Sequence, residues 1–210
     1  MLKKPNTWIW ILIVVYAVGA AGLILPETRA YVQKVVWINV LLSFVVLFSF
    51  HKKWSKEFIW SSLLILFCGY LLEVLGVKTG YVFGYYNYGN TLGYSFWETP
   101  VLIGFIWLMC IYITRNIAEL ITKEPVLISI TGAVLMVGLD YFLEPFAVRF
   151  GLWSWNSGFI PKHNYIGWFI SAFVFHYLYL KSCKFALNKI SAPLYFIQLA
   201  FFLILYLCFK

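Results

Sequence analysis

Charged residues are scarce in this 210-residue sequence. Asp, Glu, Lys and Arg make up 11% of it, while 63% of the residues are hydrophobic. Soluble domains carry about a quarter charged residues and about half apolar ones. A chain this poor in charge cannot cover a water-exposed surface with polar groups, so we expect an integral membrane protein.

Residues that bind transition metals are also few. The three histidines, His51, His163 and His176, are too few to hold the metals of a membrane di-iron oxygenase. The four cysteines lie far apart on apolar segments, with no C-x-x-C pair: Cys68, Cys110, Cys183 and Cys208. Zinc and iron–sulfur ligands are spaced differently, so the cysteines are expected to pack as small apolar residues. No metal site is predicted.

Long apolar runs dominate what is present. Seven of them are long enough to predict membrane-spanning helices, since one crossing needs ~20 mostly apolar residues. They cover approximately residues 8–25, 32–50, 58–75, 100–114, 125–143, 165–180 and 192–209. Seven crossings leave only short connections. The sequence therefore predicts an all-α polytopic membrane bundle, with residues 1–210 as a single transmembrane domain.

The net charge of +8 comes from basic clusters between the apolar runs. Ten basic residues fall on the side of the N-terminus: Lys3, Lys4, Lys52, Lys53, Lys56, Arg115, Lys123, Lys181, Lys184 and Lys189. Six fall on the other side: Arg29, Lys34, Lys78, Arg149, Lys162 and Lys210. Because cytoplasmic loops carry the excess of positive charge, the N-terminus is predicted to be cytoplasmic and the C-terminus outside. We expect a multi-pass protein of the cell membrane, with no nucleic-acid partner.

Two acidic residues lie inside apolar runs. Glu73 in the third run and Asp140 in the fifth are each fifteen residues from the cytoplasmic start of their run. At ~1.5 Å per residue this places them ~22 Å into a hydrocarbon core of ~30 Å. An ionisable group at such a depth is costly and is by default assigned a functional role. The alternative is a carboxyl tied to a neighbouring helix for packing, or one already at headgroup level.

Glu144 follows Asp140 by four residues, so a continuing helix would place both carboxyls on one face. Pro145 disfavours the helical conformation at Glu144. The helix is therefore predicted to end there, with Glu144 turning into the loop. Two carboxyls in close reach and in apolar surroundings keep a proton near neutral pH, which suits a general acid.

The connections 76–99 and 145–164, both predicted on the outer side, are long and rich in aromatics and glycine. The pattern Phe-Gly-x-aromatic-x-aromatic occurs in both, at 83–88 and 150–155, and this offset of 67 also carries Glu73 onto Asp140. We interpret the echo as a pseudo-repeat in which each unit delivers a carboxyl and folds an aromatic loop over it. A chance match in an aromatic-rich chain is the alternative.

The alternating pairs Tyr86/Tyr88 and Trp153/Trp155 would each place two rings on one side of an extended segment. Ring faces stabilise cations and bind flat apolar ligands. Other aromatic residues of these loops are equally explained by the belt of Trp and Tyr at a membrane interface.

Residues 73–168 contain two long motif blocks. They read Glu73-Val74-x-Gly76-x-x-Thr79-Gly80-x-x-Phe83-Gly84-x-Tyr86-x-Tyr88-x-x-x-Leu92-Gly93, then Pro100, then Asp140-x-x-x-Glu144-Pro145, Gly151-x-Trp153-x-Trp155 and Pro161-x-x-Asn164-x-x-Gly167-Trp168. This set resembles the carotenoid biosynthesis family of membrane proteins, which includes carotenoid 1,2-hydratases and bisanhydrobacterioruberin hydratase. The sequence departs from the more apolar family pattern at Lys162 and His163.

The resemblance implies a hydro-lyase that adds water across the terminal C1,C2 double bond of an acyclic ψ-end carotenoid, giving a tertiary alcohol with no redox cofactor. Protonation of C2 forms a tertiary cation at C1. This chemistry requires a buried acid, aromatic faces and one placed water. The expected partners are the acyclic carotenoid, water and membrane lipid, with other enzymes of the carotenoid pathway as candidates.

We predict Asp140 as the proton donor, with Glu73 or Glu144 holding and activating water. The site of the cation would be lined by aromatic side chains: Tyr86, Tyr88, Trp153 and Trp155. Asn164 is predicted either to orient the water or to help begin the sixth helix. His176 is predicted to pack as a satisfied buried histidine.

Two other functions stay open at this point. A ψ-end cyclase would form the same cation and close a ring when an internal double bond captures it. A transporter or binding protein for lipids or isoprenoids would use the carboxyls to relay protons or to bind a headgroup. A water placed near the carboxyls favours hydration, a dry pocket favours cyclisation, and access from both membrane faces favours transport.

Overall fold

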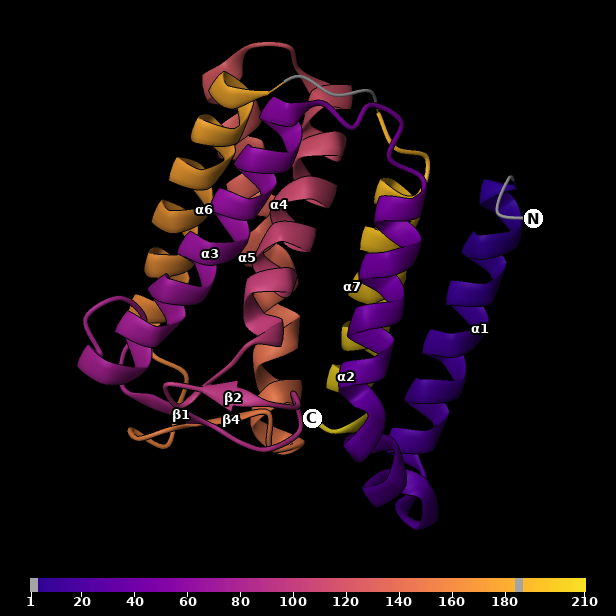
Figure 1. The fold of residues 1–210 in the computed structure, drawn as a ribbon. Coiled ribbons are helices and arrows are strands. Elements are labelled where there is room, and N and C mark those ends of the chain that lie inside the picture. Colours follow the sequence, from indigo (N-terminus) through magenta and orange to yellow (C-terminus); the bar gives the residue numbers. More distant parts are fainter. Residues whose placement is uncertain (1–3, 184–186) are drawn as a thin grey trace.

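The computed structural model describes residues 4–183 and 187–210, which form a helical bundle with a small extended region at one end (Figure 1). Within this part of the chain there are seven helices: α1 (Pro5–Ile24), α2 (Pro26–Ser49), α3 (Lys56–Thr79), α4 (Leu102–Ile121), α5 (Pro125–Arg149), α6 (Lys162–Ser182) and α7 (Ser191–Cys208). Among these described helices, the six other than α6 are long and apolar enough to cross a membrane. The predicted all-α polytopic bundle is confirmed.

The helix ends follow local sequence signals. Proline occupies the first turn of α1, α2 and α5, where its missing N–H removes no helical hydrogen bond. At the start of α3 the Ser55 hydroxyl accepts a hydrogen bond from the Phe58 N–H, and the helix ends at Gly80, whose φ of 67° is left-handed. Both ends of α3 are thus set locally, and Glu73 lies two turns before Gly80.

Helix α4 is the centre of the bundle. The apolar 18-residue segment of α4 is 83% buried, whereas the corresponding segments of the other five candidate spans among the described residues are 22–39% buried. On one side α4 packs with α3, α5 and α6, and on the other it meets α7 and α2 (Figure 1). Glycine brings α3 and α4 close together, because a Cβ at Gly69 would lie 2.6 Å from the Cβ of Trp107. This close approach holds Trp107 against α3.

Helix α4 runs further than its sequence pattern predicted. The prediction ended the fourth helix at residue 114, before the first charge, whereas α4 continues to Ile121. Arg115 stays inside the bundle because its guanidinium pairs with Glu119 at 2.8 Å and donates to the carbonyls of Tyr179 and Cys183. A buried charge that has such partners does not end a membrane helix.

Helix α5 also continues past the proline at which we predicted its end. Pro145 lies inside α5, so Glu144 is helical and does not turn into the loop. A proline removes one backbone hydrogen bond, and a membrane helix tolerates the loss where neighbouring helices pack against it. Helices α4, α6 and α7 all contact α5. The uninterrupted helix keeps Asp140 and Glu144, four residues apart, on one face.

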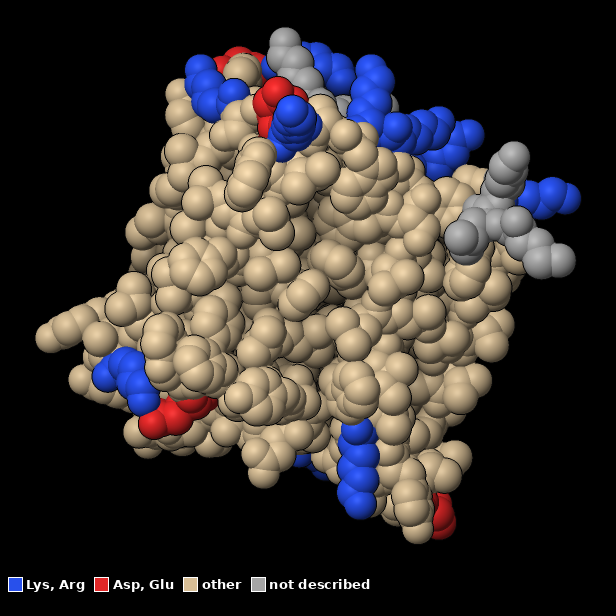
Figure 2. Space-filling model, viewed as in Figure 1, with Lys and Arg blue, Asp and Glu red and all other residues tan. Residues whose placement is uncertain are grey.

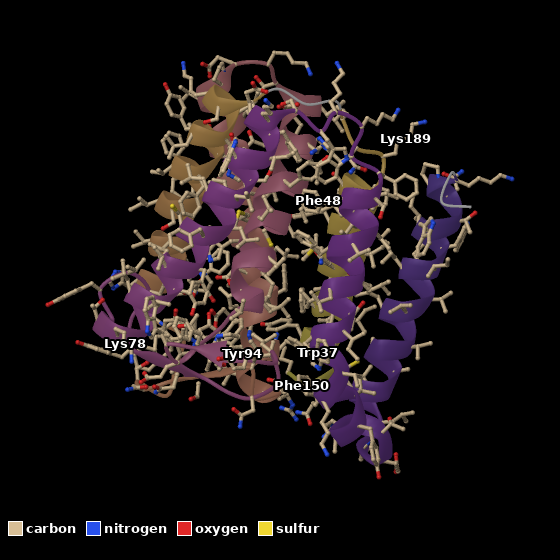
Figure 3. The ribbon with its side chains drawn as sticks, in the orientation of Figure 1. Trp37, Phe48, Lys78, Tyr94, Phe150 and Lys189 are labelled. Atoms are coloured by element: carbon tan, nitrogen blue, oxygen red, sulfur yellow. The ribbon has the colours of Figure 1, made fainter. Side chains whose placement is uncertain are left out.

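Lysine and arginine side chains gather at the end of the bundle where the N-terminus lies (Figure 2). The C-terminus lies near the opposite end (Figure 1). Lys189 is at the basic end, while Lys78, Tyr94 and Phe150 are at the other end, beside the extended region (Figure 3). This is the asymmetry on which the positive-inside rule rests, and the orientation in the membrane stays a prediction.

The long connections α3–α4 and α5–α6 meet at what we call the aromatic end, the end of the bundle that carries the strands. Strand β1 (Tyr86–Tyr88) pairs antiparallel with β4 (Trp153–Trp155), and β2 (Ser95–Phe96) pairs with β3 (Thr99–Pro100). Tyr86 lies opposite Trp155, and Tyr88 lies opposite Trp153. Main-chain hydrogen bonds therefore join two loops that are far apart in sequence.

Gly167 lets α6 approach the loop that precedes β1. A Cβ at this position would lie 2.2 Å from the backbone oxygen of Val82, which no side-chain movement can relieve. We expect Gly167→Ala to cost about 1–3 kcal/mol of overpacking, which lowers the melting temperature of the solubilised protein by about 2–4 °C per kcal/mol. Gly138→Ala, whose nearest contact would be at 3.9 Å, is the control and should melt like the wild type. Equal melting of both variants would contradict this packing.

Candidate active site

Glu73 is a buried carboxyl of α3, only 3% exposed. Its Oε2 accepts hydrogen bonds from the hydroxyls of Tyr86 at 2.5 Å and Tyr88 at 2.7 Å. Its Oε1 accepts one from the indole N–H of Trp107 at 2.9 Å. Because each carboxylate oxygen accepts about two hydrogen bonds, Oε2 is filled while Oε1 has room for one more donor.

Glu144 of α5 is held in the same way. Its Oε2 accepts hydrogen bonds from the indole N–H groups of Trp153 at 3.1 Å and Trp155 at 2.9 Å. Its Oε1 accepts one from Asn164 Nδ2 at 3.1 Å. Each of the two glutamates is thus bound by three donors, two of which come from alternate aromatic residues of one strand.

Asp140 is the third buried carboxyl, 2% exposed. Asn164 Nδ2 donates to Asp140 Oδ2 at 3.1 Å as well as to Glu144, so one amide nitrogen joins both carboxyls. The other oxygen, Oδ1, is buried and has no hydrogen-bond partner among residues 4–183 and 187–210. The residue that caps α6 is Pro161, so Asn164 lies in the first turn of this helix and does not cap it. The side chain of Asn164 serves the carboxyls instead.

The paired strands explain why the aromatic side chains converge. The ring centroids of Tyr86 and Trp155 lie 5.1 Å apart, and those of Tyr88 and Trp153 lie 5.9 Å apart. Alternate residues of a strand point to one face, which here is the face of the carboxyls. Burial and the nearby Glu73 carboxyl raise the pKa of both tyrosine hydroxyls well above its usual value of 10.0. Both hydroxyls therefore keep their protons and act as donors.

The echo between the two loops is partly explained by this pairing. The segments 83–88 and 150–155 contain β1 and β4, which are hydrogen-bonded to each other. The match of Glu73 with Asp140 was wrong, however, because the carboxyl that binds the second aromatic pair is Glu144. Glu144 lies one turn nearer the aromatic end of α5 than Asp140, and the helix continues through it.

The partners of the three carboxyls are neutral groups. The two ion pairs that the described residues form, Lys78–Glu98 and Arg115–Glu119, include none of these carboxyls. The donors around them are tyrosine, tryptophan and asparagine side chains. Such a cluster can give up or take a proton without breaking a buried salt bridge, which would be costly.

A cavity of about 520 Å³ lies between the group α1, α2 and α7 and the group α3, α4 and α5. Its wall is apolar over most of its extent. At the aromatic end the wall includes Glu73, Glu144 and Asn164, together with the four aromatic side chains of β1 and β4. Asp140 is not among the described residues that line the cavity, but it accepts a hydrogen bond from Asn164, which does line it.

Two tryptophans that no sequence motif assigned to the site complete this wall. Trp107, the donor to Glu73, is 0% exposed to solvent and stacks on Trp168 with 4.5 Å between ring centroids. Trp107 lies within an apolar run, where a tryptophan has no distinguishing spacing. Trp168 belongs to the second motif block but had no predicted contact. Only the packing of α4 against α3 and α6 brings them to the site.

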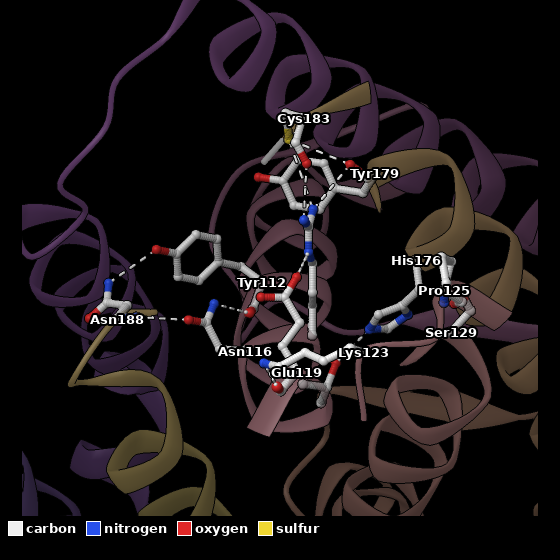
Figure 4. Close-up of polar contacts among 12 residues, drawn as sticks. Tyr112, Asn116, Glu119, Lys123, Pro125, Ser129, His176, Tyr179, Cys183 and Asn188 are labelled. Carbon is white, nitrogen blue, oxygen red and sulfur yellow. Dashed lines mark hydrogen bonds and ion pairs between the residues drawn. The ribbon is translucent and has the colours of Figure 1, made fainter. Parts of the chain in front are cut away.

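A second buried polar cluster lies on α4 toward the basic end of the bundle (Figure 4). His176 is hydrogen-bonded through Nε2 to the Thr114 hydroxyl at 2.9 Å and through Nδ1 to the Ala172 carbonyl at 2.7 Å. The prediction of a satisfied packing histidine is confirmed. The backbone N–H of Asn188 donates to Asn116 Oδ1 at 2.8 Å, which ties the segment before α7 to α4. These hydrogen bonds hold helix ends and a connecting segment together, so packing accounts for this second cluster.

The sequence of this chain is similar to sequences of known carotenoid biosynthesis proteins. The family model described as carotenoid biosynthesis protein matches residues 32–209, more than half of the chain. This chain belongs to the carotenoid biosynthesis protein family. Bisanhydrobacterioruberin hydratase from Haloarcula japonica is 29% identical over 123 residues, which cover 50% of this chain and 39% of that protein. The matched part is thus less than half of this relative. No solved structure matches the chain.

Proposed function

We propose that this protein is a carotenoid hydratase, a hydro-lyase of the cell membrane that adds water to the terminal C1,C2 double bond of an acyclic ψ-end carotenoid. The observation that carries the proposal is one apolar cavity whose end holds carboxyls and an ordered set of aromatic rings. Membership of the family supports carotenoid chemistry. The similar protein from H. japonica is named a hydratase, which supports the reaction type.

The reaction needs a proton at C2 and a hydroxyl group at C1. A carboxylic acid gives its proton to C2, the π electrons form the new C–H bond, and a tertiary cation is left at C1. The oxygen of water then bonds to C1 and loses a proton to a carboxylate. One proton is given and one is taken back, so the reaction needs neither an oxidant nor a reductant.

In this proposal Asp140 and Glu144 act together as the acid. One N–H donates to Asp140 while three donors hold Glu144, so the carboxylate form is better supported at Glu144 and the shared proton resides on Asp140. Of these two carboxyls, only Glu144 is among the described residues that border the cavity. We assign Asp140 as the store of the proton and Glu144 as the group that presents it to the alkene.

Glu73 takes the proton of the attacking water, and this proton then returns through water in the cavity to the Asp140–Glu144 pair, which restores the acid for the next turnover. Its Oε1 has an unused acceptor position beside Trp107, and the residue borders the cavity. The ring faces around the carboxyls stabilise the cation, each by about 0.5–2 kcal/mol. These rings belong to Tyr86, Tyr88, Trp153 and Trp155. Asn164 joins the two members of the acid and keeps them at one end of the polyene.

Trp153 offers a graded test of cation stabilisation. Trp153→Phe keeps a ring but loses the N–H that donates to Glu144, and Trp153→Leu loses both. We expect hydration rates to fall in the order wild type, Phe, Leu, with a loss of about 10- to 30-fold for Leu. The carotenoid retained by the purified protein should change much less. Tyr94→Leu, at an exposed aromatic of the same end, is the control, and an equal loss there would contradict the role of Trp153.

The proposed function is tested by expressing the chain in a bacterial host that accumulates an acyclic carotene such as lycopene. Extracted pigments are separated by chromatography, and their molecular masses are determined by mass spectrometry. A product heavier by one water, with an unshifted chromophore, is expected. An isomer of unchanged mass with a shifted spectrum would mean cyclisation. Unchanged pigment, with the protein verified in the membrane, would contradict both enzyme functions and favour transport or binding.

A further inference from the structure

The cavity has a second polar region away from the carboxyls. Tyr16 of α1, Asn39 of α2 and Gln198 of α7 all line it where the wall is otherwise apolar. Tyr16 is 6% exposed and Gln198 is 5% exposed. Polar groups in the membrane interior are costly unless they are paired or used. The contacts of these three side chains therefore indicate what this part of the cavity binds.

The donor and the acceptor of each hydrogen bond in this region can be assigned, starting from one backbone carbonyl. The Ser43 hydroxyl donates to the backbone carbonyl of Asn39 at 2.8 Å, because a carbonyl oxygen can only accept a hydrogen bond. The Tyr16 hydroxyl, 3.0 Å from Ser43 Oγ, then donates to Ser43. This leaves the Tyr16 oxygen to accept from Gln198 Nε2 at 3.1 Å. The Gln198 amide is thus oriented with its nitrogen toward Tyr16 and its oxygen away from it.

Two amide oxygens of this region have no donor among the described residues. Gln198 Oε1 and Asn39 Oδ1 are both buried and lack a hydrogen-bond partner within the described part of the chain. Both belong to side chains that line the cavity. Because an amide oxygen accepts and cannot donate, a group that satisfies either one must bring a hydrogen of its own. An O–H group of a bound molecule has this property, and a hydrocarbon does not.

This region and the carboxyl cluster border the same cavity and are linked by a short row of rings. Tyr16 contacts Phe201 with 5.3 Å between centroids, and Phe201 contacts Phe146 at 5.7 Å. Phe201 follows Gln198 by three residues on α7, and Phe146 follows Glu144 by two on α5. One elongated ligand can therefore reach both places at once.

We propose that Gln198 and Asn39 form a hydroxyl-binding subsite, and that the preferred ligand is an acyclic isoprenoid polyene that already carries a hydroxyl group away from the double bond to be hydrated. The proposal deepens the hydratase function and rests on it for the class of ligand. A hydrocarbon polyene leaves both amide oxygens unpaired, whereas an alcohol pairs at least one of them. One buried hydrogen bond of this kind corresponds to a preference of roughly tenfold.

The test measures pigment retention, which requires no turnover. The protein is purified in detergent from a host that accumulates an acyclic carotene together with its monohydroxylated derivative. Bound pigments are then quantified relative to their proportions in the membrane. The wild type should enrich the hydroxylated pigment roughly tenfold. Gln198→Met keeps the length of the side chain but removes the acceptor, and it should bring the enrichment close to one.

Tyr16→Phe is the matched control. It breaks the same hydrogen bond between α1 and α7 but leaves the acceptor oxygen of Gln198 in place, so it should keep most of the enrichment. An equal loss in both variants would overturn the proposal, because the interhelical bond rather than the oxygen would then matter. A wild type that retains both pigments alike would also overturn it, as expected if water pairs with these oxygens.

The two proposals fail in different ways. Enrichment of the hydroxylated pigment by a protein that hydrates neither pigment would support the subsite and refute the hydratase function. Hydration without enrichment would support the function and refute the subsite.

Discussion

Asp140→Asn and Glu144→Gln are each expected to reduce hydration of an acyclic carotene by about 10²–10⁴-fold, the usual contribution of a general acid. Both amides keep the shape of the carboxyl, but neither carries a transferable proton. The measurement is the initial rate of hydrated pigment formation in isolated membranes that contain equal amounts of folded protein. Glu98→Gln, at an exposed acid of the same end that pairs with Lys78, should keep its full rate.

The double variant shows whether the two carboxyls act as one acid. If they do, the variant that carries both Asp140→Asn and Glu144→Gln should be nearly as active as the slower of the two single variants, because either change alone already removes the acid. Multiplied losses would mean two independent roles. Full activity in Asp140→Asn would show that Asp140 does not store the proton. Full activity in both single variants would contradict the proposed acid altogether.

Glu73→Leu is expected to affect both stability and chemistry. The substitution leaves two buried donors and one partly buried donor without their acceptor: Tyr86 and Trp107, and Tyr88. Each unsatisfied buried donor costs about 1–3 kcal/mol, so the free energy of unfolding should fall by several kcal/mol and the hydration rate should fall below detection. Thermal melting in detergent and pigment conversion in membranes measure the two effects.

Tyr88→Phe in the Glu73→Leu background separates a hydrogen-bond effect from a packing effect. Removing a donor whose acceptor is already absent should restore part of the melting temperature, although Tyr88→Phe alone lowers it. A double variant that melts lower than Glu73→Leu would show that these hydrogen bonds do not carry the stability. Activity should stay lost in either case, because the acceptor for the proton of water is still missing.

The helices could be predicted because their apolar runs are long and the polar segments between them are short. The predicted helix ends were wrong where a polar residue or a proline has partners or supporting helices inside the bundle. Arg115 stays in α4 because it meets Glu119 and two carbonyls from the end of α6. Pro145 stays in α5 because neighbouring helices support the chain there. Neither partnership is visible along the sequence.

The three carboxyls could be found because acids are rare within apolar runs, and the strand aromatics because they alternate. The sequence could not show which acid meets which aromatic pair, since that depends on how far α5 continues. It also could not show the polar region of the cavity. Tyr16 and Gln198 are 182 positions apart, and only the packing of α1 against α7 joins them.

The most direct test of the central claim follows the atoms of water into the product. Membranes that contain the protein are incubated with an acyclic carotene in water enriched in oxygen-18 and, separately, in deuterium oxide. We expect a heavy oxygen in the new hydroxyl group, one non-exchangeable deuterium at C2 and no need for molecular oxygen. A hydroxyl oxygen derived from molecular oxygen, or a product without deuterium at C2, would contradict it.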